Sequence, residues 1–154
     1  MQTFLPYSDF RKSAECLDYR RLGKQRLEAN DILCLVYKIM GKDKKEELEL
    51  SERQMTYLWR RFRHHPAVLM WVGYIGALKS YRNTIIEEWI ERGYRNNIRI
   101  LPVRKKIKKP FWLGNRKFHS SHRSNLLRKN LEFYSKYDWE EKNNLPYLWP
   151  VRKK

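Results

Sequence analysis

A single charged stretch decides how this chain is organised: Leu17-Asp18-Tyr19-Arg20-Arg21-Leu22-Gly23-Lys24-Gln25-Arg26-Leu27-Glu28. It holds four cations, two carboxylates, an amide and one glycine, and it leads into the apolar run from Ile32 to Met40. If the stretch is helical, its spacing puts four polar side chains on one face, namely Asp18, Arg21, Gln25 and Glu28. Such a face can bind an anion and offer it a carboxylate. The alternative is an exposed helix whose charges form salt bridges with one another.

The whole chain is strongly basic. Its 154 residues carry a net charge of +17, and a surface of that sign attracts nucleic-acid phosphates or anionic lipid. Hydrophobic residues make up 42% of the chain, so we expect one folded domain over residues 1–154. No apolar stretch is long enough to cross a bilayer and no signal-peptide pattern is present. We therefore expect no membrane partner and a soluble, intracellular monomer, in the cytoplasm or nucleoid or at a viral replication site.

The two cysteines, Cys16 and Cys34, do not form a close pair in the sequence. Two cysteines without such a pair indicate neither a disulfide framework nor a cysteine-based zinc site. We expect both to be buried or half-buried free thiols.

Helix signals divide the first two-thirds of the chain. Residues 1–7 form an extended lead-in, Ser8 or Asp9 can cap a short helix, and Gly41 ends the main helix that follows. A charged connector over 42–50 precedes the capping box of residues 51–54, which opens a helix to about residue 62. Pro66 suits the start of the next helix. Apolar residues at helical spacing then predict one long buried helix over 67–92, ended by Gly93.

The last third combines a loop, a helix and a strap. Pro102 and Pro110 bracket a basic loop over 98–110, and residues 118–137 are expected to be helical in one or two pieces. The aromatic and proline-rich segment 145–150 suits an extended strap across the core. No alternating pattern is strong enough to build a sheet. The prediction is an all-α fold, a compact single-domain bundle of several helices with an extended N-terminal lead-in and a C-terminal strap.

Residues 92–129 contain no Asp or Glu and many Lys and Arg. A segment whose charges are all positive repels itself unless a polyanion is bound, so this segment indicates a surface that binds a polyanion. Within it, the segment His119 to Ser124 is a dense cluster of short donors of the kind that contacts a phosphodiester backbone. A helix start capped by Ser120 or Ser121 would bind an anion as well. We expect nucleic-acid contacts from these side chains: Arg20, Arg21, Gln25, Arg26, His65, Arg116, Lys117, His119, Ser121, His122, Arg123, Arg128 and Lys129.

Three aromatic side chains near these cations are candidates for stacking on an unpaired base: Trp112, Tyr134 and Tyr137. Core packing is the commoner role of any single aromatic residue.

Four histidines raise the question of a metal site: His64, His65, His119 and His122. The last two are three residues apart and could share one ion, but no H-E-x-x-H or C-x-x-C pattern accompanies them. We therefore expect no metal and no cofactor, and we expect phosphate contact or helix capping from the histidines.

Three segments carry a resemblance to a known family: Tyr19-Arg20-Arg21-Leu22, the helix Tyr74 to Gly93 with Glu87 to Tyr94 at its end, and Ser124 to Tyr137. In order and spacing they are similar to the pyrimidine-dimer DNA glycosylases of the phage endonuclease V type. The chain resembles a bacterial and viral branch of that superfamily more closely, over nearly its whole length. The matching motifs of that branch are the segments 1–6, 21–26, 64–68, 112–114, 121–126 and 145–150.

This resemblance implies an all-α fold, an N-terminal amine as nucleophile, a glutamate directly after Tyr-Arg, and basic residues that grip kinked duplex DNA. Two positions depart from the pattern. Arg21 stands where the family carries its catalytic glutamate. Gln2 is larger than the side chains that methionine removal normally tolerates, so the expected terminal amine is that of Met1 itself, and Thr3 resembles the family's terminal threonine only by type.

The missing glutamate leaves two carboxylates as candidates. Glu28 is the first choice and Asp18 the second, because both share the helical face of Arg21. Glu28 could equally form an ion pair with Lys24, four residues before it, and do no chemistry. Lys24 is the reserve nucleophile, because surrounding cations favour a neutral amine.

The sequence thus predicts a DNA-repair glycosylase with AP-lyase activity on damaged or modified pyrimidines in double-stranded DNA. A free amine would attack C1′ of the nucleotide, and the resulting Schiff base would permit elimination at the 3′ phosphate. The alternative is a non-catalytic nucleic-acid-binding protein that keeps this fold. A metal-dependent nuclease is a third possibility.

Overall fold

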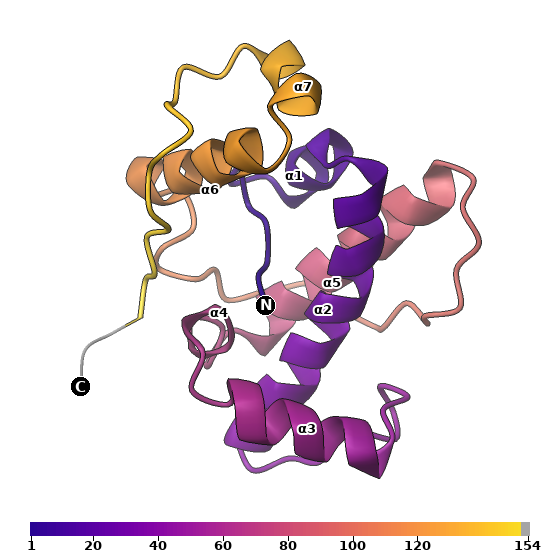
Figure 1. Ribbon diagram of the computed structural model, residues 1–154. Coiled ribbons are helices and arrows are strands. Elements are labelled where there is room, and N and C mark those ends of the chain that lie inside the picture. Colours follow the sequence, from indigo (N-terminus) through magenta and orange to yellow (C-terminus); the bar gives the residue numbers. More distant parts are fainter. Residues whose placement is uncertain (152–154) are drawn as a thin grey trace.

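The computed structural model describes residues 1–151, and that part of the chain contains helices and no strand (Figure 1). The elements are α1 Phe10–Cys16, α2 Tyr19–Ile39, α3 Glu52–Phe62, α4 Pro66–Leu69, α5 Ile75–Glu91, α6 Arg116–Lys129, α7 Leu131–Tyr134 and a 3-10 helix Ser135–Tyr137. The predicted all-α class is confirmed. The last three residues of the expected domain, 152–154, lie outside the described residues.

Capping side chains set where the helices begin. Asp9 accepts a hydrogen bond of 2.9 Å from the backbone amide of Lys12, so it caps α1. Ser51 and Gln54 form the predicted capping box at the start of α3. Asp18 caps α2, which corrects our expectation that Asp18 lies within the helix on the face of Glu28.

The expected single helix over 67–92 is broken into two. Helix α4 ends at Leu69 and α5 begins at Ile75. Gly73 lies between them with φ of +89°, a conformation that glycine adopts without steric penalty and that interrupts the helical hydrogen bonds. The turn also directs Trp71 into the core. The longest helix is therefore α2, with 21 residues, and α5 ends before Gly93 as predicted.

Helices α2 and α5 pack along each other and form the centre of the bundle. The N-terminal segment runs into this centre, with α6 on the other side of it (Figure 1). Both cysteines are buried and free, as predicted. No helix within the described residues is long and apolar enough to span a membrane.

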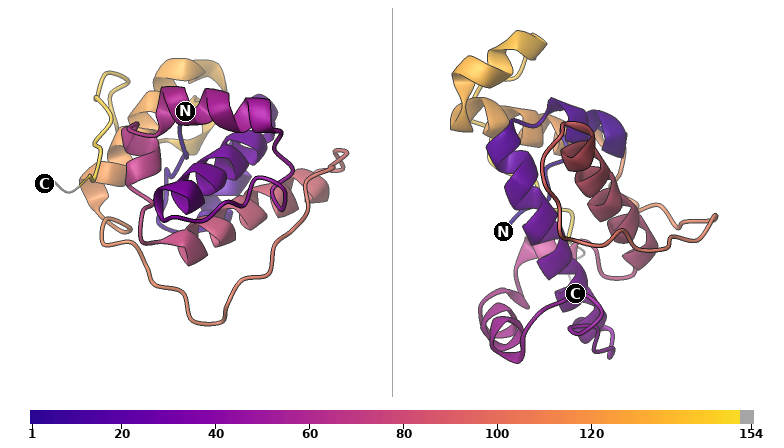
Figure 2. Two further views of the ribbon diagram at one scale, coloured as in Figure 1. Left: turned by 90° about the horizontal axis from the view of Figure 1, so that it is seen from below. Right: turned by 90° about the vertical axis from the view of Figure 1, so that its right-hand side faces the viewer.

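Two long segments without helix or strand complete the fold. The connection from α5 to α6 contains the predicted basic loop over 98–110 and runs around the outside of the bundle (Figure 2). The C-terminal segment returns along α6, where Leu148 donates a backbone hydrogen bond of 3.2 Å to the Ser121 hydroxyl. The side-chain amide of Asn125 donates a hydrogen bond of 3.1 Å to the carbonyl of Leu145. This strap forms one wall of a cavity, through Tyr147 and Trp149.

Candidate active site

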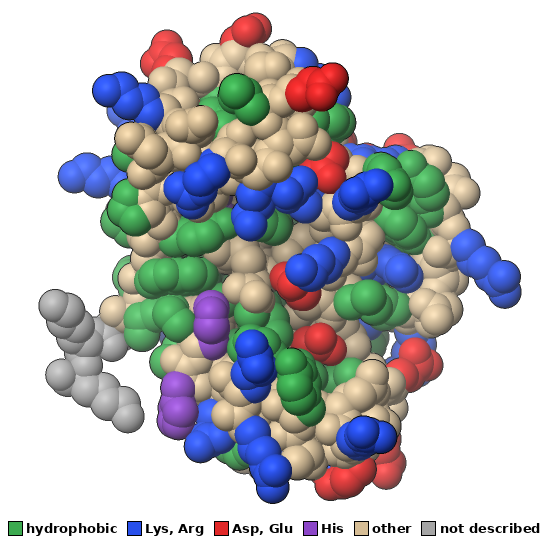
Figure 3. Space-filling model, viewed as in Figure 1, with side chains coloured by type: hydrophobic (Ala, Val, Ile, Leu, Met, Phe, Trp, Pro, Cys, Tyr) green, Lys and Arg blue, Asp and Glu red, His purple; other side chains and the backbone are tan. Residues whose placement is uncertain are grey.

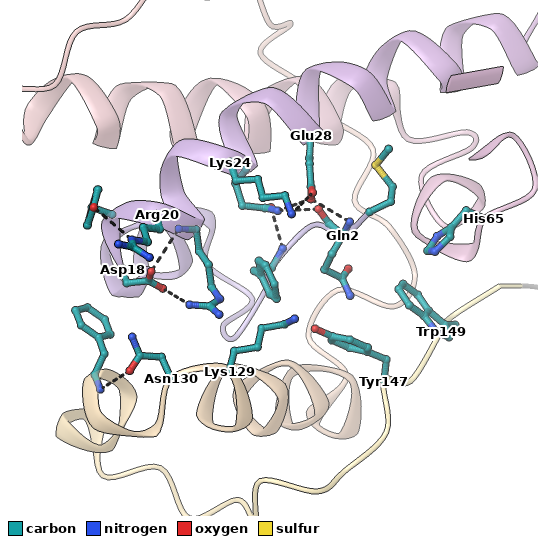
Figure 4. Close-up of a pocket in the computed structure, with 16 residues that line it drawn as sticks. Gln2, Asp18, Arg20, Lys24, Glu28, His65, Lys129, Asn130, Tyr147 and Trp149 are labelled. Carbon is teal, nitrogen blue, oxygen red and sulfur yellow. Dashed lines mark hydrogen bonds and ion pairs between the residues drawn. The ribbon is translucent and has the colours of Figure 1, made fainter. Parts of the chain in front are cut away.

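A cavity of about 820 Å³ opens between the first half of α2, the end of α6 and the C-terminal segment (Figure 4). All four expected catalytic residues line it: Met1, Asp18, Lys24 and Glu28. Five of the expected nucleic-acid-binding residues line it as well: Arg20, Arg21, Gln25, His65 and Lys129. The other lining residues are Gln2, Phe4, Tyr19, Asn130, Phe133, Tyr147 and Trp149. The sequence analysis did not assign these seven residues to the site, and most of them reach it only through long-range packing.

Buried polar side chains hold the N-terminal segment in place and so bring residue 1 to the cavity. The backbone of Leu5 is held at both ends, because its amide donates to Nδ1 of His122 at 2.9 Å and its carbonyl oxygen lies 2.8 Å from Nδ1 of His119. Trp71 donates from its indole nitrogen to the Thr3 hydroxyl at 3.1 Å. With residues 2–6 buried in this way, Met1 has little freedom to leave the cavity wall.

Glu28 contacts the first peptide group of the chain. Its Oε2 accepts a hydrogen bond of 3.2 Å from the backbone amide of Gln2, and Figure 4 shows the carboxylate pointing from α2 towards this peptide. Gln25 donates to the same oxygen at 3.2 Å. The other oxygen, Oε1, lies 3.6 Å from the amine of Lys24. The Glu28 side chain is only 15% exposed, so its position is fixed by these partners.

Gln25 is a positioning residue in this structure. Its amide nitrogen donates to the Gln2 carbonyl at 2.8 Å, and its oxygen accepts from the Phe4 amide at 3.0 Å and from the Tyr81 hydroxyl at 2.6 Å. The side chain is buried and both ends of its amide are hydrogen-bonded. Gln25 is therefore engaged within the protein, which differs from its expected contact with nucleic acid.

Asp18 has a structural role at another part of the cavity wall, where it binds Arg21 and Tyr134. Its carboxylate accepts from the backbone amide of Arg21, forms an ion pair with the Arg21 guanidinium at 3.1 Å, and accepts from the Tyr134 hydroxyl. Burial raises the pKa of Asp18, but the hydrogen bonds from Tyr134 and Arg21 outweigh it and hold the pKa below its ordinary value. Arg21 is thus held against a carboxylate.

Three amines surround the cavity. The α-amine of Met1 lies close enough to His65 to lower the pKa of that imidazole, in addition to the larger effect of burial. The Lys24 side chain is 74% exposed and pairs with Glu28. Lys129 extends into the cavity from the end of α6 (Figure 4), and burial together with the nearby Arg21 lowers its pKa. The cavity therefore combines amines, guanidinium groups and a fixed carboxylate.

The histidine and serine cluster of α6 faces inward, which corrects our expectation of phosphate contacts. His122 is fully buried, and His119 and Ser121 are buried beside it. His119 accepts from the Gly114 amide at 2.9 Å through Nε2, so both of its ring nitrogens are used within the protein. The two histidines hold Leu5 of the N-terminal segment, and Ser121 holds Leu148 of the C-terminal segment, so these buried side chains are engaged within the protein.

Other expected contacts lie away from the cavity. Arg123 forms an ion pair with Glu141 at 2.6 Å and donates to the carbonyl of Pro6 at 2.6 Å, so it too has a structural role. Arg26 packs over the ring of Trp89. Arg116, Lys117 and Arg128 are exposed and do not line the cavity. Trp112 and Tyr134, expected as stacking candidates, are buried in the core.

The part of the chain that the structure describes contains no set of side chains suited to bind a metal ion. Residues 1–151 contain no group of three or more His, Cys, Asp or Glu side chains placed to hold an ion. In the pair expected to be most suitable, His119 uses both ring nitrogens in hydrogen bonds to Leu5 and Gly114, and His122 uses Nδ1 to accept from Leu5.

Comparison with protein families gives one match. The family described as pyrimidine dimer DNA glycosylase matches residues 1–101, about two-thirds of the chain. The chain belongs to the pyrimidine dimer DNA glycosylase family. Comparisons with curated proteins and with solved structures give no match.

Family membership supports a DNA-repair role and a DNA substrate. The matched residues include Met1, Asp18, Lys24, Glu28 and His65, which form one side of the cavity. The side formed by α6, α7 and the C-terminal segment lies outside the match. The cavity therefore has one side within the family match and one side outside it.

Proposed function

We propose that this member of the glycosylase family removes damaged or modified pyrimidines from duplex DNA and cleaves the resulting abasic site through a Schiff base. The observation that carries the proposal is the 3.2 Å hydrogen bond between the Gln2 amide and the Glu28 carboxylate. It holds a carboxylate beside the first residue of the chain in a cavity lined with cations. Amine, carboxylate and phosphate-binding groups are what this chemistry requires.

The proposed nucleophile is the α-amine of Met1. This amine belongs to the first residue of the chain, next to the peptide that the Glu28 carboxylate contacts. The amine attacks C1′ and forms a carbon–nitrogen bond, while the base departs with the electrons of the glycosidic bond. Opening of the sugar ring leaves an iminium ion. Loss of a proton from C2′ then expels the 3′ phosphate by elimination.

Glu28 is the proposed general acid–base group. It lies next to the first peptide through Oε2 and next to Lys24 through Oε1, so it can accept a proton from the attacking amine and return one to the opening sugar. General acid–base catalysis of this kind contributes typically about 10²–10⁴-fold in rate. Because Gln25 and the Gln2 amide hold the carboxylate, it is already positioned before substrate binds.

The cations around the cavity are the proposed phosphate contacts. Arg20 and Lys24 are exposed at the cavity wall, and Lys129 reaches it from the opposite side. Phosphate contacts of this kind fix the register of a protein on DNA without reading its sequence. They would place the damaged nucleotide between the Met1 amine and the Glu28 carboxylate.

Borohydride trapping tests the proposal. The protein is mixed with duplexes that carry an abasic site or a cyclobutane pyrimidine dimer, reduced, digested, and mapped by mass spectrometry. We expect a covalent adduct on the residue 1 amine, and no adduct on that amine when extra residues precede Met1. An adduct on Lys24 or Lys129 would reassign the nucleophile, and no adduct on either duplex would overturn the enzymatic proposal.

Two ion pairs favour a second candidate, a DNA-binding protein without catalysis. Arg21 replaces the family glutamate and is held by Asp18, and Glu28 is paired with Lys24. A protein of this kind would bind damaged duplex DNA with the same cavity and give no trapped adduct.

A further inference from the structure

An aromatic surface without a role in the proposed chemistry lies where α2 begins and α5 ends. Tyr19 and Tyr94 are 52% and 41% exposed, and their ring centroids are 6.1 Å apart at an interplanar angle of 32°. Tyr94 also lies on Trp89, with centroids 4.4 Å apart at 30°. The three rings form a continuous array, which we call the aromatic platform.

Arginine side chains accompany the platform. The guanidinium of Arg26 lies 4.9 Å from the centroid of the Trp89 ring, and that of Arg20 lies 5.9 Å from the centroid of the Tyr19 ring. Figure 3 shows hydrophobic side chains exposed over this end of α5, next to Lys and Arg side chains. An apolar face beside cations matches a ligand that is flat, aromatic and anionic.

Close packing fixes the position of the platform. A Cβ atom on Gly23 would lie 2.9 Å from Cζ3 of Trp89, so the glycine allows the indole to rest against α2. The indole nitrogen donates to the carbonyl of Arg95 at 2.9 Å, and Arg26 donates to the side chain of Asn96 at 2.9 Å. Gly23 and Arg26 of the opening charged stretch, which the proposed chemistry does not use, thus serve to hold this array.

The platform is continuous with the candidate active site. Tyr19 and Arg20 belong to the platform and its cations, and they also line the cavity. A DNA strand whose damaged nucleotide occupies the cavity would therefore pass next to the exposed rings of Tyr19 and Tyr94.

We propose that the aromatic platform of Tyr19, Trp89 and Tyr94 is a second binding site, which stacks on an unpaired base of DNA beside the damaged nucleotide. The inference rests on the proposed DNA-binding function. Bases within an intact duplex are stacked on one another, so the platform selects DNA in which a base has become unpaired. Stacking accepts any base, because every base has a π-face, and Arg20 and Arg26 attract the adjoining phosphates.

Binding of two abasic-site duplexes by the Tyr94→Ala variant tests this inference. One duplex is otherwise fully paired and the other has an unpaired 2-aminopurine next to the abasic site. We expect Tyr94→Ala to weaken binding of the second duplex about tenfold, with a much smaller effect on the first. Contact with the platform should also quench the 2-aminopurine fluorescence, and the variant should lose this quenching.

Matched variants make the test specific. Tyr94→Phe keeps the ring and should bind like the parent protein. Tyr57→Ala removes a tyrosine that is 57% exposed on α3, away from the cavity lining, and should also bind like the parent. Equal binding and equal quenching by Tyr94→Ala and the parent, with normal borohydride trapping, would overturn the platform alone. A parent protein that binds neither duplex would overturn the platform together with the proposed function.

Discussion

The carboxylate of Glu28 accepts a hydrogen bond of 3.2 Å from the backbone amide of Gln2. This contact links the middle of α2 to the first peptide of the chain and brings a fixed carboxylate beside the amine of residue 1. In our proposal this carboxylate takes the role that the resemblance to the family would give to the residue after Tyr19-Arg20, which is Arg21 in this chain.

Glu28→Gln should separate catalysis from binding. The amide keeps the shape of the side chain and can still accept from the Gln2 amide, but it can no longer act as a general base. Lesion cleavage should fall by about two orders of magnitude or more. DNA affinity should hold or rise, because a negative charge leaves a site that faces a polyanion. Single-turnover cleavage and a binding titration on the same duplex measure the two effects.

Asp18→Asn is the matched control for that variant. Because Asp18 caps α2 and is paired with Arg21 and Tyr134, its replacement should lower thermal stability and leave single-turnover cleavage close to the parent rate. Loss of cleavage in Asp18→Asn, with normal cleavage in Glu28→Gln, would show that the two carboxylates have been assigned the wrong way round.

Removal of cavity cations should reduce the salt dependence of DNA binding. Each phosphate contact contributes roughly 0.9 to the slope of log affinity against log salt concentration. Arg20→Ala and Lys129→Ala should each flatten the slope by about that amount. Arg60→Ala, which removes an exposed cation of α3, serves as the control. Slopes equal to that of the parent in all three variants would show that these cavity cations do not contact phosphate.

The proposed chemistry needs an amine and a carboxylate, and no step requires an ion. Cleavage of a lesion duplex should therefore persist in EDTA. The decisive comparison is the rate with EDTA against the rate after a divalent ion is added back. Full loss on chelation, with recovery on addition of the ion, would favour the metal-dependent nuclease.

Local sequence signals predicted the helical class, several helix ends and much of one cavity wall. The capping box at Ser51 and the stop at Gly93 depend on neighbouring residues only, and both were predicted correctly. The helical spacing of Arg21, Gln25 and Glu28 placed three cavity residues together for the same reason. Asp18 joins them as the helix cap, just outside the helix.

Long-range contacts explain what the sequence did not predict. His119 and His122 bind Leu5, which is 114 and 117 residues away in the chain, so their inward direction depends on where the N-terminal segment runs. The same holds for Tyr147 and Trp149, which reach the cavity from the C-terminal segment. A basic, polar segment such as His119 to Ser124 resembles a phosphate-binding surface until the buried segment that it holds is known.

The last prediction concerns how acid affects the hydrogen bond by which His122 anchors Leu5 of the N-terminal segment. Burial lowers the pKa of His122 to about 3, and its Nδ1 must stay unprotonated to accept from the Leu5 amide. In the unfolded chain a histidine takes up its proton near pH 6.5. The unfolded state therefore binds the extra proton between about pH 6.5 and pH 3. The free energy of unfolding should fall as the pH is lowered through that window, by at most about 1.4 kcal/mol per pH unit from this group.

Asp31 changes the free energy of unfolding with pH in the opposite direction to His122. Burial and the nearby Glu28 raise the pKa of Asp31 to about 7. Its contribution to stability increases as the pH falls below 7, since the folded state then binds the proton more readily than the unfolded chain. The two effects are separated by comparing the parent with His122→Asn in urea titrations at pH 7 and pH 4.5. The variant should be less stable at pH 7, because the anchor of Leu5 is weakened, and it should lose less stability than the parent on acidification. An identical pH dependence in both proteins would show that protonation of His122 does not oppose folding.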